Sequence, residues 1–585
     1  MKYSDVMVEW LVQLGYTHCF FVGGGNIMHL VESCSRRLTC VPTVHEVAAG
    51  IAAEYFNEAN QGGRAFAMVT AGPGLTNAVT GIAGAWLESR ELLVIGGQVK
   101  TADLARGQVR QRGIQEIDGV SIVKPITVRA ERIETTVDRA TFADIVESGS
   151  RGRKGPVFLE VPLDIQARDV DEVALSTEIS LPAGPATTSA ADIAALAERI
   201  AKARRPVFLL GGGVARTTTD ALTDRFAEVG IPVATTWNAA DRLDSEHPVY
   251  FGRPNTWGQR YANLVLQQAD LLIAVGTRLS LQQSGFNWQE FIPGGEIVHV
   301  DCDQAELDKG HPTIHWPICA DANALLLDLL PQDLGEHADW LAYCNQIKAD
   351  LPLSETNNTG EAYLSPYAAV SGLSEACTGD DVVIPCSSGG AFTVMMQAFR
   401  QKAGQLMITN KGLASMGYGL SGAIGAALAT KRRTILIEGD GGFSQNLQEI
   451  GTATINDLDL KIFIFDDNGY ASIRQTQMNY FNGRYVGCDL KTGLGLPNWQ
   501  KLFATYDVPV HTLAPGFEKD AAFLETFNTP GVQAFIVPVD PQQTYFPRIA
   551  SRVVEGGGMV SNPLHRMTPE LDETVEARLA AYIPK

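Results

Sequence analysis

The sequence lacks any apolar run long enough to cross a bilayer. One stretch of small and apolar residues, 418–430, is rich in Gly and Ala but falls short of the ~20 residues that a membrane-spanning helix needs. The N-terminal stretch has neither the unbroken apolar core nor the small-residue cleavage site of a secretory signal. We therefore expect no membrane association.

Basic residues and paired cysteines are also scarce. The chain has 46 Lys and Arg against 66 Asp and Glu, a formal net charge of -20, and a field of this sign repels nucleic acid and anionic lipid. Its nine cysteines include no CxxC pair, and an odd, scattered set fits a reduced compartment better than a disulfide framework. We expect a cytoplasmic protein with no nucleic-acid partner.

What the sequence does contain is strand-like runs that alternate with helix-like ones. They form three blocks at 1–166, 191–330 and 366–540, separated by polar links at 167–190 and 331–365 and followed by a tail at 541–585. Continuous apolar strands of this kind are typical of parallel sheets covered by helices on both faces. The predicted fold class is α/β, with three doubly wound domains.

Two acidic turns follow neighbouring strand-like runs of the third block. Gly439, Asp440, Gly441 and Gly442 come after one run, and Asp466–Gly469 comes after the next. The carboxyl ends of neighbouring parallel strands meet at one edge, where α/β sheets bind ligands. Carboxylate, carbonyl and phosphate oxygens are what Mg²⁺ prefers, and glycines let the backbone approach closely. The turns predict a magnesium-bound diphosphate.

This pair of turns resembles the diphosphate motif of thiamine diphosphate enzymes. The resemblance puts Asp440, Asp467 and the carbonyl of Gly469 at the magnesium-ligand positions, and Tyr470 and Ile473 among the cofactor-binding residues. Asp467 departs from the family, which normally has Asn at this position. It still supplies an oxygen but adds a negative charge beside the ion.

The first block carries HEVAAG from His45, TAGPGLTN from Thr70 and GGQV from Gly96. Glu46 by itself is typical of a solvated carboxylate in the first turn of a helix. In this order, however, the motifs resemble the pyrimidine-binding domain of acetolactate synthase-like enzymes. The resemblance implies that Glu46 is catalytic and protonates N1′ of the aminopyrimidine. It also implies cofactor contacts from Gly72, Pro73, Asn77, Ala414 and Met416, although Met416 is equally typical of a hydrophobic core.

The middle block opens on a glycine run, Gly211–Gly213, after an apolar strand. Such a run alone is a weak sign of a nucleotide. The segments 255–263, 276–285 and 298–307 add to it, because they resemble flavin-contacting segments of acetolactate synthases. We therefore expect FAD, which is mostly structural in that family. The expected contacts are Gly212, Gly213, Gly276, Thr277, Arg278 and Asp301.

Histidine is missing from the segment 110–118, where related aldehyde-releasing decarboxylases commonly carry a His pair. Gln115 instead matches the glutamine of the acetolactate synthase FQE motif, which borders the substrate site from the neighbouring subunit, and Ile114 replaces its Phe. The resemblance thus favours carboligation, with Gln115 as a second catalytic candidate. It also implies a homodimer or homotetramer, because the family builds each active site between two chains.

Thr476 lies nine residues after Asp467, where acetolactate synthases carry a Trp that walls the pocket. A smaller side chain opens space for an acceptor, unless Thr476 lies on a solvated helix face. The expected acceptor pocket is Gly24, Gly25, Ile114 and Thr476.

The leading hypothesis is that the enzyme decarboxylates pyruvate and transfers the two-carbon unit to a ketone. The thiamine-dependent flavoenzyme of yersiniose biosynthesis, which this family includes, uses a CDP-4-keto-3,6-dideoxysugar in this way. Three alternatives stay open: acetolactate synthesis from two pyruvates, a pyruvate oxidase-like flavoenzyme, and a catalytically silent cofactor-binding protein.

Overall fold

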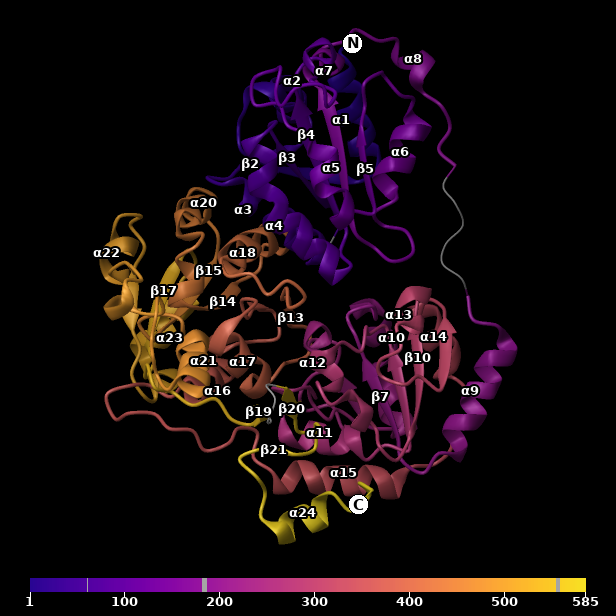
Figure 1. Ribbon diagram of the computed structural model, residues 1–585, viewed down its shortest axis with the longest axis vertical. Coiled ribbons are helices and arrows are strands. Elements are labelled where there is room, and N and C mark those ends of the chain that lie inside the picture. The colour runs from indigo at the N-terminus through magenta and orange to yellow at the C-terminus, as the bar shows by residue number, and fades with distance from the viewer. Residues whose placement is uncertain (60–61, 181–186, 554–557, 585) are drawn as a thin grey trace.

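The computed structural model contains three α/β units, each built around one sheet (Figure 1). It describes residues 1–59, 62–180, 187–553 and 558–584, so part of the predicted link at 167–190 and part of the tail lie outside the described residues. Every strand pair inside the three large sheets is parallel. The predicted fold class is confirmed.

The first unit has the strand order β2-β1-β3-β4-β6-β5. One face of its sheet packs against α1, α2 and α6, and the other packs against α3 and α4. Both faces are covered because the central strands β3, β4 and β6 are mostly apolar, with Arg64, Gln98 and Glu160 as their polar residues. The elements are α1 Tyr3–Gln13, β1 Tyr16–Phe21, α2 Met28–Ser35, β2 Thr39–Pro42, α3 Glu46–Glu58, β3 Arg64–Val69, α4 Pro73–Glu88, β4 Leu92–Gln98, α5 Gly119–Val123, β5 Arg129–Arg132, α6 Arg139–Glu147, β6 Pro156–Pro162, α7 Leu163–Gln166 and α8 Glu172–Leu175.

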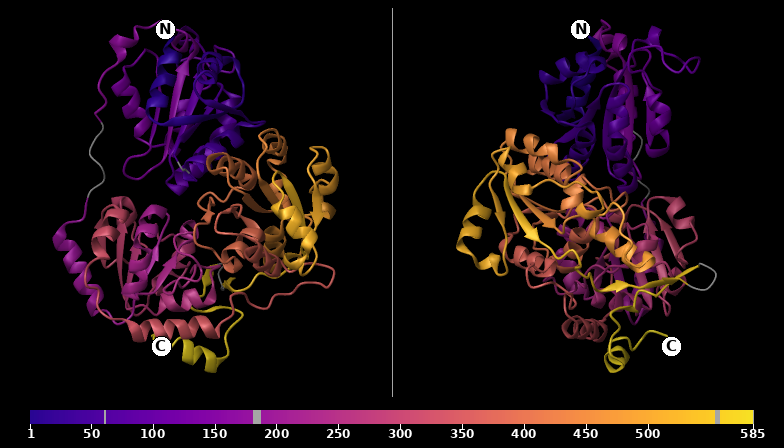
Figure 2. Two further views of the ribbon diagram at one scale, coloured as in Figure 1. Left: turned by 180° about the vertical axis from the view of Figure 1, so that it is seen from behind. Right: turned by 60° about the vertical axis from the view of Figure 1, so that its left-hand side comes forward.

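The second unit has the order β11-β10-β9-β7-β8. Helices α9, α10 and α14 cover one face, whereas α11 and α15 cover the other together with α24 from the chain's tail. The two views in Figure 2 show α24 lying below this unit. The elements are α9 Ala190–Lys202, β7 Pro206–Leu210, α10 Arg216–Val229, β8 Val233–Thr235, α11 Arg260–Gln267, β9 Leu271–Val275, α12 Leu281–Ser284, β10 Glu296–Asp301, α13 Gln304–Asp308, β11 Trp316–Cys319, α14 Ala322–Leu329, α15 Ala338–Asp350 and α24 Glu573–Leu579.

The third unit has the order β13-β12-β14-β15-β17-β16. Helices α16, α17 and α23 pack on one face, and α18, α20 and α22 pack on the other. Its elements and the short tail strands are α16 Pro366–Ala376, β12 Val382–Ile384, α17 Gly389–Ala398, β13 Leu406–Met407, α18 Tyr418–Thr430, β14 Thr434–Gly439, α19 Asp440–Phe443, α20 Ile450–Ile455, β15 Leu460–Asp466, α21 Ala471–Phe481, α22 Trp499–Ala504, β16 Val510–Thr512, α23 Ala521–Asn528, β17 Gln533–Pro538, β18 Arg548–Ile549, β19 Ser551–Val553, β20 Met559–Ser561 and β21 Met567–Thr568.

Small residues let the first and third units pack closely. Helix α3 lies on α18, and its Ile51 and Tyr55 belong to the core of the third unit. A Cβ on Gly425 would lie 2.1 Å from the Ala52 carbonyl oxygen, and one on Gly422 would lie 2.6 Å from the Tyr55 ring. Side chains larger than hydrogen at these two positions would therefore separate the helices. In the described part of the chain, no helix combines the length and apolarity needed to cross a membrane.

Candidate active site

The two predicted acidic turns meet at one edge of the third sheet. Asp440 follows β14 and Asp467 follows β15, and these strands pair in parallel up to Gly439 and Phe465. The backbone N–H of Gly469 donates to Asp440 Oδ2 at 2.9 Å. The turn after β15 is therefore held against the carboxylate that ends β14, which brings all three predicted magnesium positions together.

Both carboxylates are buried, at 1% exposure for Asp440 and 7% for Asp467. Burial and the neighbouring charges of Asp467 and Asp466 raise the pKa of Asp440 well above its usual range. Two buried, mutually repelling carboxylates are a suitable donor set for a hard cation. Among the described residues, no group of three or more His, Cys, Asp or Glu side chains is arranged for a metal. Backbone and phosphate oxygens would have to complete the shell, which fits a diphosphate-bound Mg²⁺.

Gly469 can serve there only as glycine. Its φ is +149°, and a Cβ would lie 2.1 Å from the carbonyl oxygen of Cys488. Gly441 is similarly restricted, because a Cβ would lie 2.4 Å from the Tyr470 ring. Of the other residues predicted near the diphosphate, Ile473 is 45% exposed on α21.

Glu438, which the sequence motifs did not indicate, packs against the start of α18 at this edge. It is 2% exposed, and a Cβ on Gly419 would lie 2.4 Å from Glu438 Oε2. Burial, only partly offset by the backbone N–H groups at the start of α18, raises the pKa of Glu438 to about 8. The signal available in the sequence was an acidic residue at the end of an otherwise apolar strand.

On the first unit, Glu46 begins α3 and lies beside α4. The side chain of His45 accepts the N–H of Val47 at 3.3 Å and so caps the helix. Glu46 is 9% exposed, and its Oε2 accepts a hydrogen bond from Asn77 Nδ2 at 3.0 Å. Its other oxygen is left outside this bond. The structure thus brings together two of the predicted site residues.

A cavity of about 450 Å³ lies between the first and third units, beside the place where they pack together. The Glu449 carboxylate accepts the N–H groups of Val44 at 3.2 Å and His45 at 3.0 Å and so holds one wall in place. The cavity is lined by Val44, His45, Val47, Thr76, Asn77 and Thr80 from the first unit and by Ser415, Met416, Gln445, Asn446 and Gln448 from the third. Met416 therefore shares a cavity with Asn77, whereas Asp440 does not line it.

Gln115 lies against the turn that begins α4. Gly72 has φ +65°, and a Cβ there would lie 2.3 Å from the Gln115 carbonyl oxygen. The surrounding loop is organised by Glu116, whose carboxylate accepts the N–H groups of Arg112 at 2.8 Å and Gly113 at 3.0 Å. Pro73 begins α4 directly after Gly72. These contacts set the loop at the carboxyl edge of the first sheet.

None of the four predicted acceptor residues lines the cavity between the first and third units. Gly24 packs on Thr70, because a Cβ there would lie 2.4 Å from the Thr70 side chain, and Gly25 begins the following turn. Ile114 is 86% exposed. Thr476 is exposed on α21, where its hydroxyl donates to the Ser472 carbonyl at 3.0 Å, and it does not line the cavity.

In the second unit, the glycines pack strand ends together. A Cβ on Gly211 would lie 2.2 Å from the Gly276 carbonyl oxygen, and one on Gly213 would lie 3.0 Å from Gly276 Cα. Gly212 is less restricted, with a Cβ 3.4 Å from the side chain of Asn238. Thr277 and Asp301 are buried at the same edge, and Arg278 lies between Thr277 and Leu279.

One buried polar atom beside Gly212, Asn238 Oδ1, lacks a partner among the described residues. The nearby Trp237 Nε1 also lacks one, but its ring packs against Phe392 of the third unit. Unsatisfied buried polar atoms call for a ligand or water. The edge of the second sheet therefore fits a nucleotide-type cofactor that hydrogen-bonds there, and nothing in the glycine packing itself requires one.

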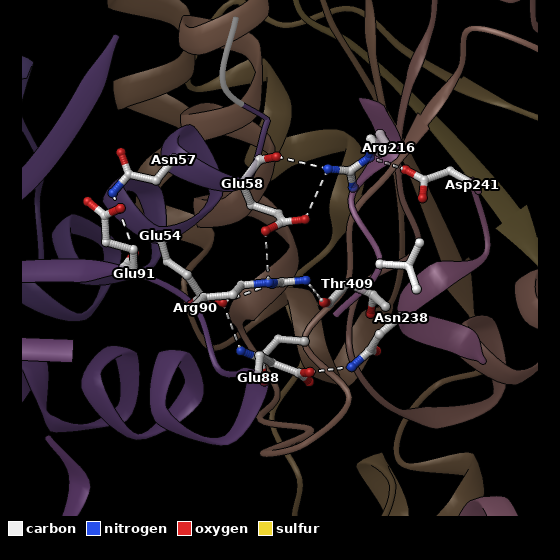
Figure 3. A network of polar contacts seen from close by, with 12 residues as sticks. Glu54, Asn57, Glu58, Glu88, Arg90, Glu91, Arg216, Asn238, Asp241 and Thr409 are labelled. Carbon is white, nitrogen blue, oxygen red and sulfur yellow. Dashed lines mark hydrogen bonds and ion pairs between the residues drawn. The ribbon is translucent and has the colours of Figure 1, made fainter. Parts of the chain in front are cut away.

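The three units meet at a buried ionic network (Figure 3). Arg90 donates to Glu54 Oε1 at 2.9 Å and to the Thr409 carbonyl at 2.7 Å. Glu54 also accepts from the hydroxyl of Tyr418 at 2.6 Å and from Asn410 Nδ2 at 3.1 Å. This carboxylate therefore fixes both ends of the segment that carries Ala414 and Met416.

The network continues into the second unit. Arg216 donates to Glu58 Oε1 at 3.0 Å and to Asp241 Oδ2 at 2.6 Å. Asp241 Oδ2 also accepts the N–H of Met407 at 2.9 Å. Because Arg90 also pairs with Glu58 at 3.6 Å, one chain of charged residues connects the helix that begins at Glu46, the second unit and the segment before Met416.

We expect Arg90→Met to lower the free energy of unfolding by about 3–5 kcal/mol, because the fully buried carboxylate of Glu54 would lose its cation. Urea unfolding monitored by circular dichroism measures this effect. Arg153→Met is the matched control, since the Arg153–Asp303 pair is partly exposed and should contribute no more than about 1 kcal/mol. Equal losses for both variants would show that the Glu54 network is not a stabilising junction.

Three family models match the chain in the order of its three units. The N-terminal TPP binding domain of thiamine pyrophosphate enzymes matches residues 1–122. The central domain of these enzymes matches residues 193–329, and their C-terminal TPP binding domain matches residues 388–537. Together these models span most of the described sequence.

Curated relatives are similar over nearly the whole chain. The acetolactate synthase isozyme 1 large subunit of Escherichia coli (strain K12) is 30% identical over 554 residues, which cover 93% of this chain and 95% of the relative. The probable acetolactate synthase large subunit of Methanocaldococcus jannaschii is 29% identical over 608 residues and 100% of both chains. The acetolactate synthase of Mycobacterium bovis is 30% identical over 85% of this chain and 81% of its own.

Proposed function

Since this chain belongs to the thiamine pyrophosphate enzyme family and is acetolactate synthase-like, we propose that it forms acetolactate from two molecules of pyruvate. Two pyruvate anions and one proton give one acetolactate anion and one carbon dioxide. The first pyruvate loses its carboxylate, and the remaining two-carbon unit forms a bond to the ketone carbon of the second. No net oxidation or reduction takes place.

The observation that carries the proposal is the assembly of Asp440, Asp467 and Gly469 at one sheet edge. These residues would hold a magnesium-bound diphosphate. Thiamine diphosphate, when bound, supplies the carbon nucleophile and the electron sink that decarboxylation requires.

The chain's own contribution to the chemistry centres on Glu46. Its Oε2 is oriented by Asn77, which leaves Oε1 to hold or release a proton toward a ring nitrogen of the cofactor. Met416 supplies an apolar surface in the cavity that also contains Asn77. Gln115, held against Gly72, is the proposed group that contacts the substrate.

The test is to incubate the protein with thiamine diphosphate, Mg²⁺ and pyruvate and to identify the products by mass spectrometry. Acetolactate and carbon dioxide in equal amounts are the expected result. Acetaldehyde as the main product would contradict carboligation. Reduction of a bound flavin by pyruvate at the turnover rate, without oxygen, would favour a pyruvate oxidase-like reaction instead.

A second candidate reaction is transfer of the same two-carbon unit to a larger ketone, such as a CDP-4-keto-3,6-dideoxysugar. The observation that favours it is the small, exposed Thr476 on a helix that also exposes the apolar side chains of Ile473, Met478 and Phe481. A surface of this kind leaves room for an acceptor bulkier than pyruvate.

We expect Thr476→Trp to reduce transfer to bulky ketones at least about tenfold while acetolactate formation changes little, because a misfit in a shaped pocket discriminates between acceptors. Competition assays with pyruvate and a panel of ketones measure the ratio of products. Thr476→Ser is the control for loss of the methyl group alone. If both products fall equally in Thr476→Trp, this position does not shape the acceptor pocket.

We also propose that the second unit binds FAD through Gly212, Gly213, Gly276, Thr277, Arg278 and Asp301. The unpartnered Asn238 Oδ1 beside Gly212 supports the proposal. The purified protein should then be yellow, and its flavin absorbance should not change during turnover, since carboligation has no redox step. A colourless preparation with full activity would contradict FAD binding.

The proposed assembly is a homodimer or homotetramer with active sites between subunits. The exposed side chains of Ile114 on the first unit and Thr476 on the third support it, because a second chain could cover both. A monomeric enzyme with full activity in analytical ultracentrifugation would contradict this assembly.

A further inference from the structure

Asp467, the acidic residue at a position where the family normally has Asn, has a charged partner seven residues further along the chain. Arg474 lies in the first turns of α21, and its Nη2 donates to Asp467 Oδ1 and, at 3.0 Å, to the Asp467 carbonyl. Its Nη1 also lies 3.5 Å from the Cys488 carbonyl. Arg474 is 6% exposed, so the guanidinium is folded back under the turn rather than directed to solvent.

The cost of burying these charges explains why they occur together. A buried carboxylate without a compensating cation is strongly unfavourable, and so is a buried guanidinium without an anion. An Asn at position 467 would need no such partner. Asp467, Arg474 and Asp440 together carry a net charge of one negative, the same as Asp440 beside a neutral Asn. The arginine thus cancels the charge that Asp467 adds.

The same contact also determines geometry. Arg474 engages Oδ1 of Asp467 and leaves Oδ2 outside the ion pair. The guanidinium also packs against Gly469, since a Cβ on that glycine would lie 2.8 Å from Nη1. One side chain therefore contacts both residues of the turn that are proposed to ligate the ion. Its Nε is buried and has no partner among the described residues.

We propose that Arg474 is a positioning residue for the metal, which neutralises and orients Asp467 so that this carboxylate performs the role of an uncharged amide. The pair would work as one unit, in which neither member can be replaced alone. This inference rests on the proposed cofactor site but not on the identity of the acceptor. It predicts that two changes together are less harmful than one.

The experiment is a double-mutant cycle with Asp467→Asn, Arg474→Met and the variant that combines them. Binding of Mn²⁺ in the presence of thiamine diphosphate is followed by electron paramagnetic resonance, without substrate or turnover. Asp467→Asn alone should weaken Mn²⁺ binding by about 10- to 100-fold, the range seen when outer partners of a metal ligand are disturbed, because it places an unpaired buried cation beside the ion. The combined variant should recover to within about threefold of the original protein.

Two further variants keep the result interpretable. Arg474→Lys retains the charge and covers the case in which Arg474→Met does not fold, and it should bind Mn²⁺ better than Arg474→Met. Arg484→Met removes an exposed arginine from the same segment and should bind like the original protein. A combined variant that binds Mn²⁺ more weakly than Asp467→Asn alone would overturn the proposal. It would show that Arg474 holds the loop in place without compensating the charge of Asp467. Failure of the unaltered protein to bind Mn²⁺ with the cofactor would instead contradict the proposed function.

Discussion

Replacing Glu46 by Gln is expected to slow turnover about 10²- to 10⁴-fold, the range that positioned proton transfer contributes. Gln can still accept the hydrogen bond that Asn77 donates to Oε2 at 3.0 Å, so α3 and the cavity wall should keep their structure. What the amide cannot do is hand a proton to a ring nitrogen. The loss should therefore appear in the chemical step and not in cofactor binding.

The direct measurement for Glu46→Gln is the rate of hydrogen–deuterium exchange at C2 of bound thiamine diphosphate. Isothermal titration should give nearly unchanged cofactor affinity in the same variant. Glu32→Gln, which alters a more exposed carboxylate of the first unit, is the matched control. Exchange at the normal rate in Glu46→Gln would remove Glu46 from the proton path.

Asp440→Asn is expected to give the second large effect, a loss of magnesium-dependent cofactor binding. The amide oxygen can still accept the N–H of Gly469, which the carboxylate now accepts at 2.9 Å, whereas the amide NH2 group cannot accept the N–H of Gly441 that Oδ1 now accepts at 2.6 Å. The ion would also lose a charged ligand. Because disturbing outer partners alone reduces metal affinity about 10- to 100-fold, replacing a direct ligand should cost at least the upper end of that range.

Titration of thiamine diphosphate at fixed Mg²⁺ measures the Asp440→Asn effect. Asp466→Asn removes the same charge one residue before Asp467, where the carboxylate accepts the N–H of Asn468 at 3.4 Å. This control should retain binding within about threefold, since Asp466 is not a proposed ligand. An equal loss of cofactor affinity in both variants would mean that only the net charge of this edge affects binding and that Asp440 is not a metal ligand.

Much of the fold was predictable because it follows from local pattern. Continuous apolar runs such as those that became β14 and β15 cannot be exposed on either face, so they require parallel sheets covered by helices. The placement of Asp440 near Gly469 was also predictable, because the ends of adjacent parallel strands meet. The hydrogen bond between Asn77 and Glu46 was not predicted, because the two residues lie on different helices and the family resemblance placed each of them at the cofactor separately.

The predicted acceptor pocket has no support from a single chain, because it includes residues of the first and the third unit. Thr476 and Ile114 are both exposed, and the proposal that they share a pocket needs a second copy of the chain. Local sequence pattern says nothing about which surfaces of two folded chains meet. The acceptor pocket therefore stays a prediction.

By itself, the sequence determined the three parallel sheets and the chemical character of the residues at their edges, because both depend on side chains close together in the chain. Only the tertiary structure decided how those edges are joined. Tyr418 donates to Glu54 across 364 positions, and Glu438 packs against Gly419 at the start of α18. Arg474 meets Asp467 because a helix turns back on its own loop. A buried charge requires an oppositely charged or hydrogen-bonding neighbour in the folded structure. The separation of two residues along the sequence does not show whether they become such neighbours.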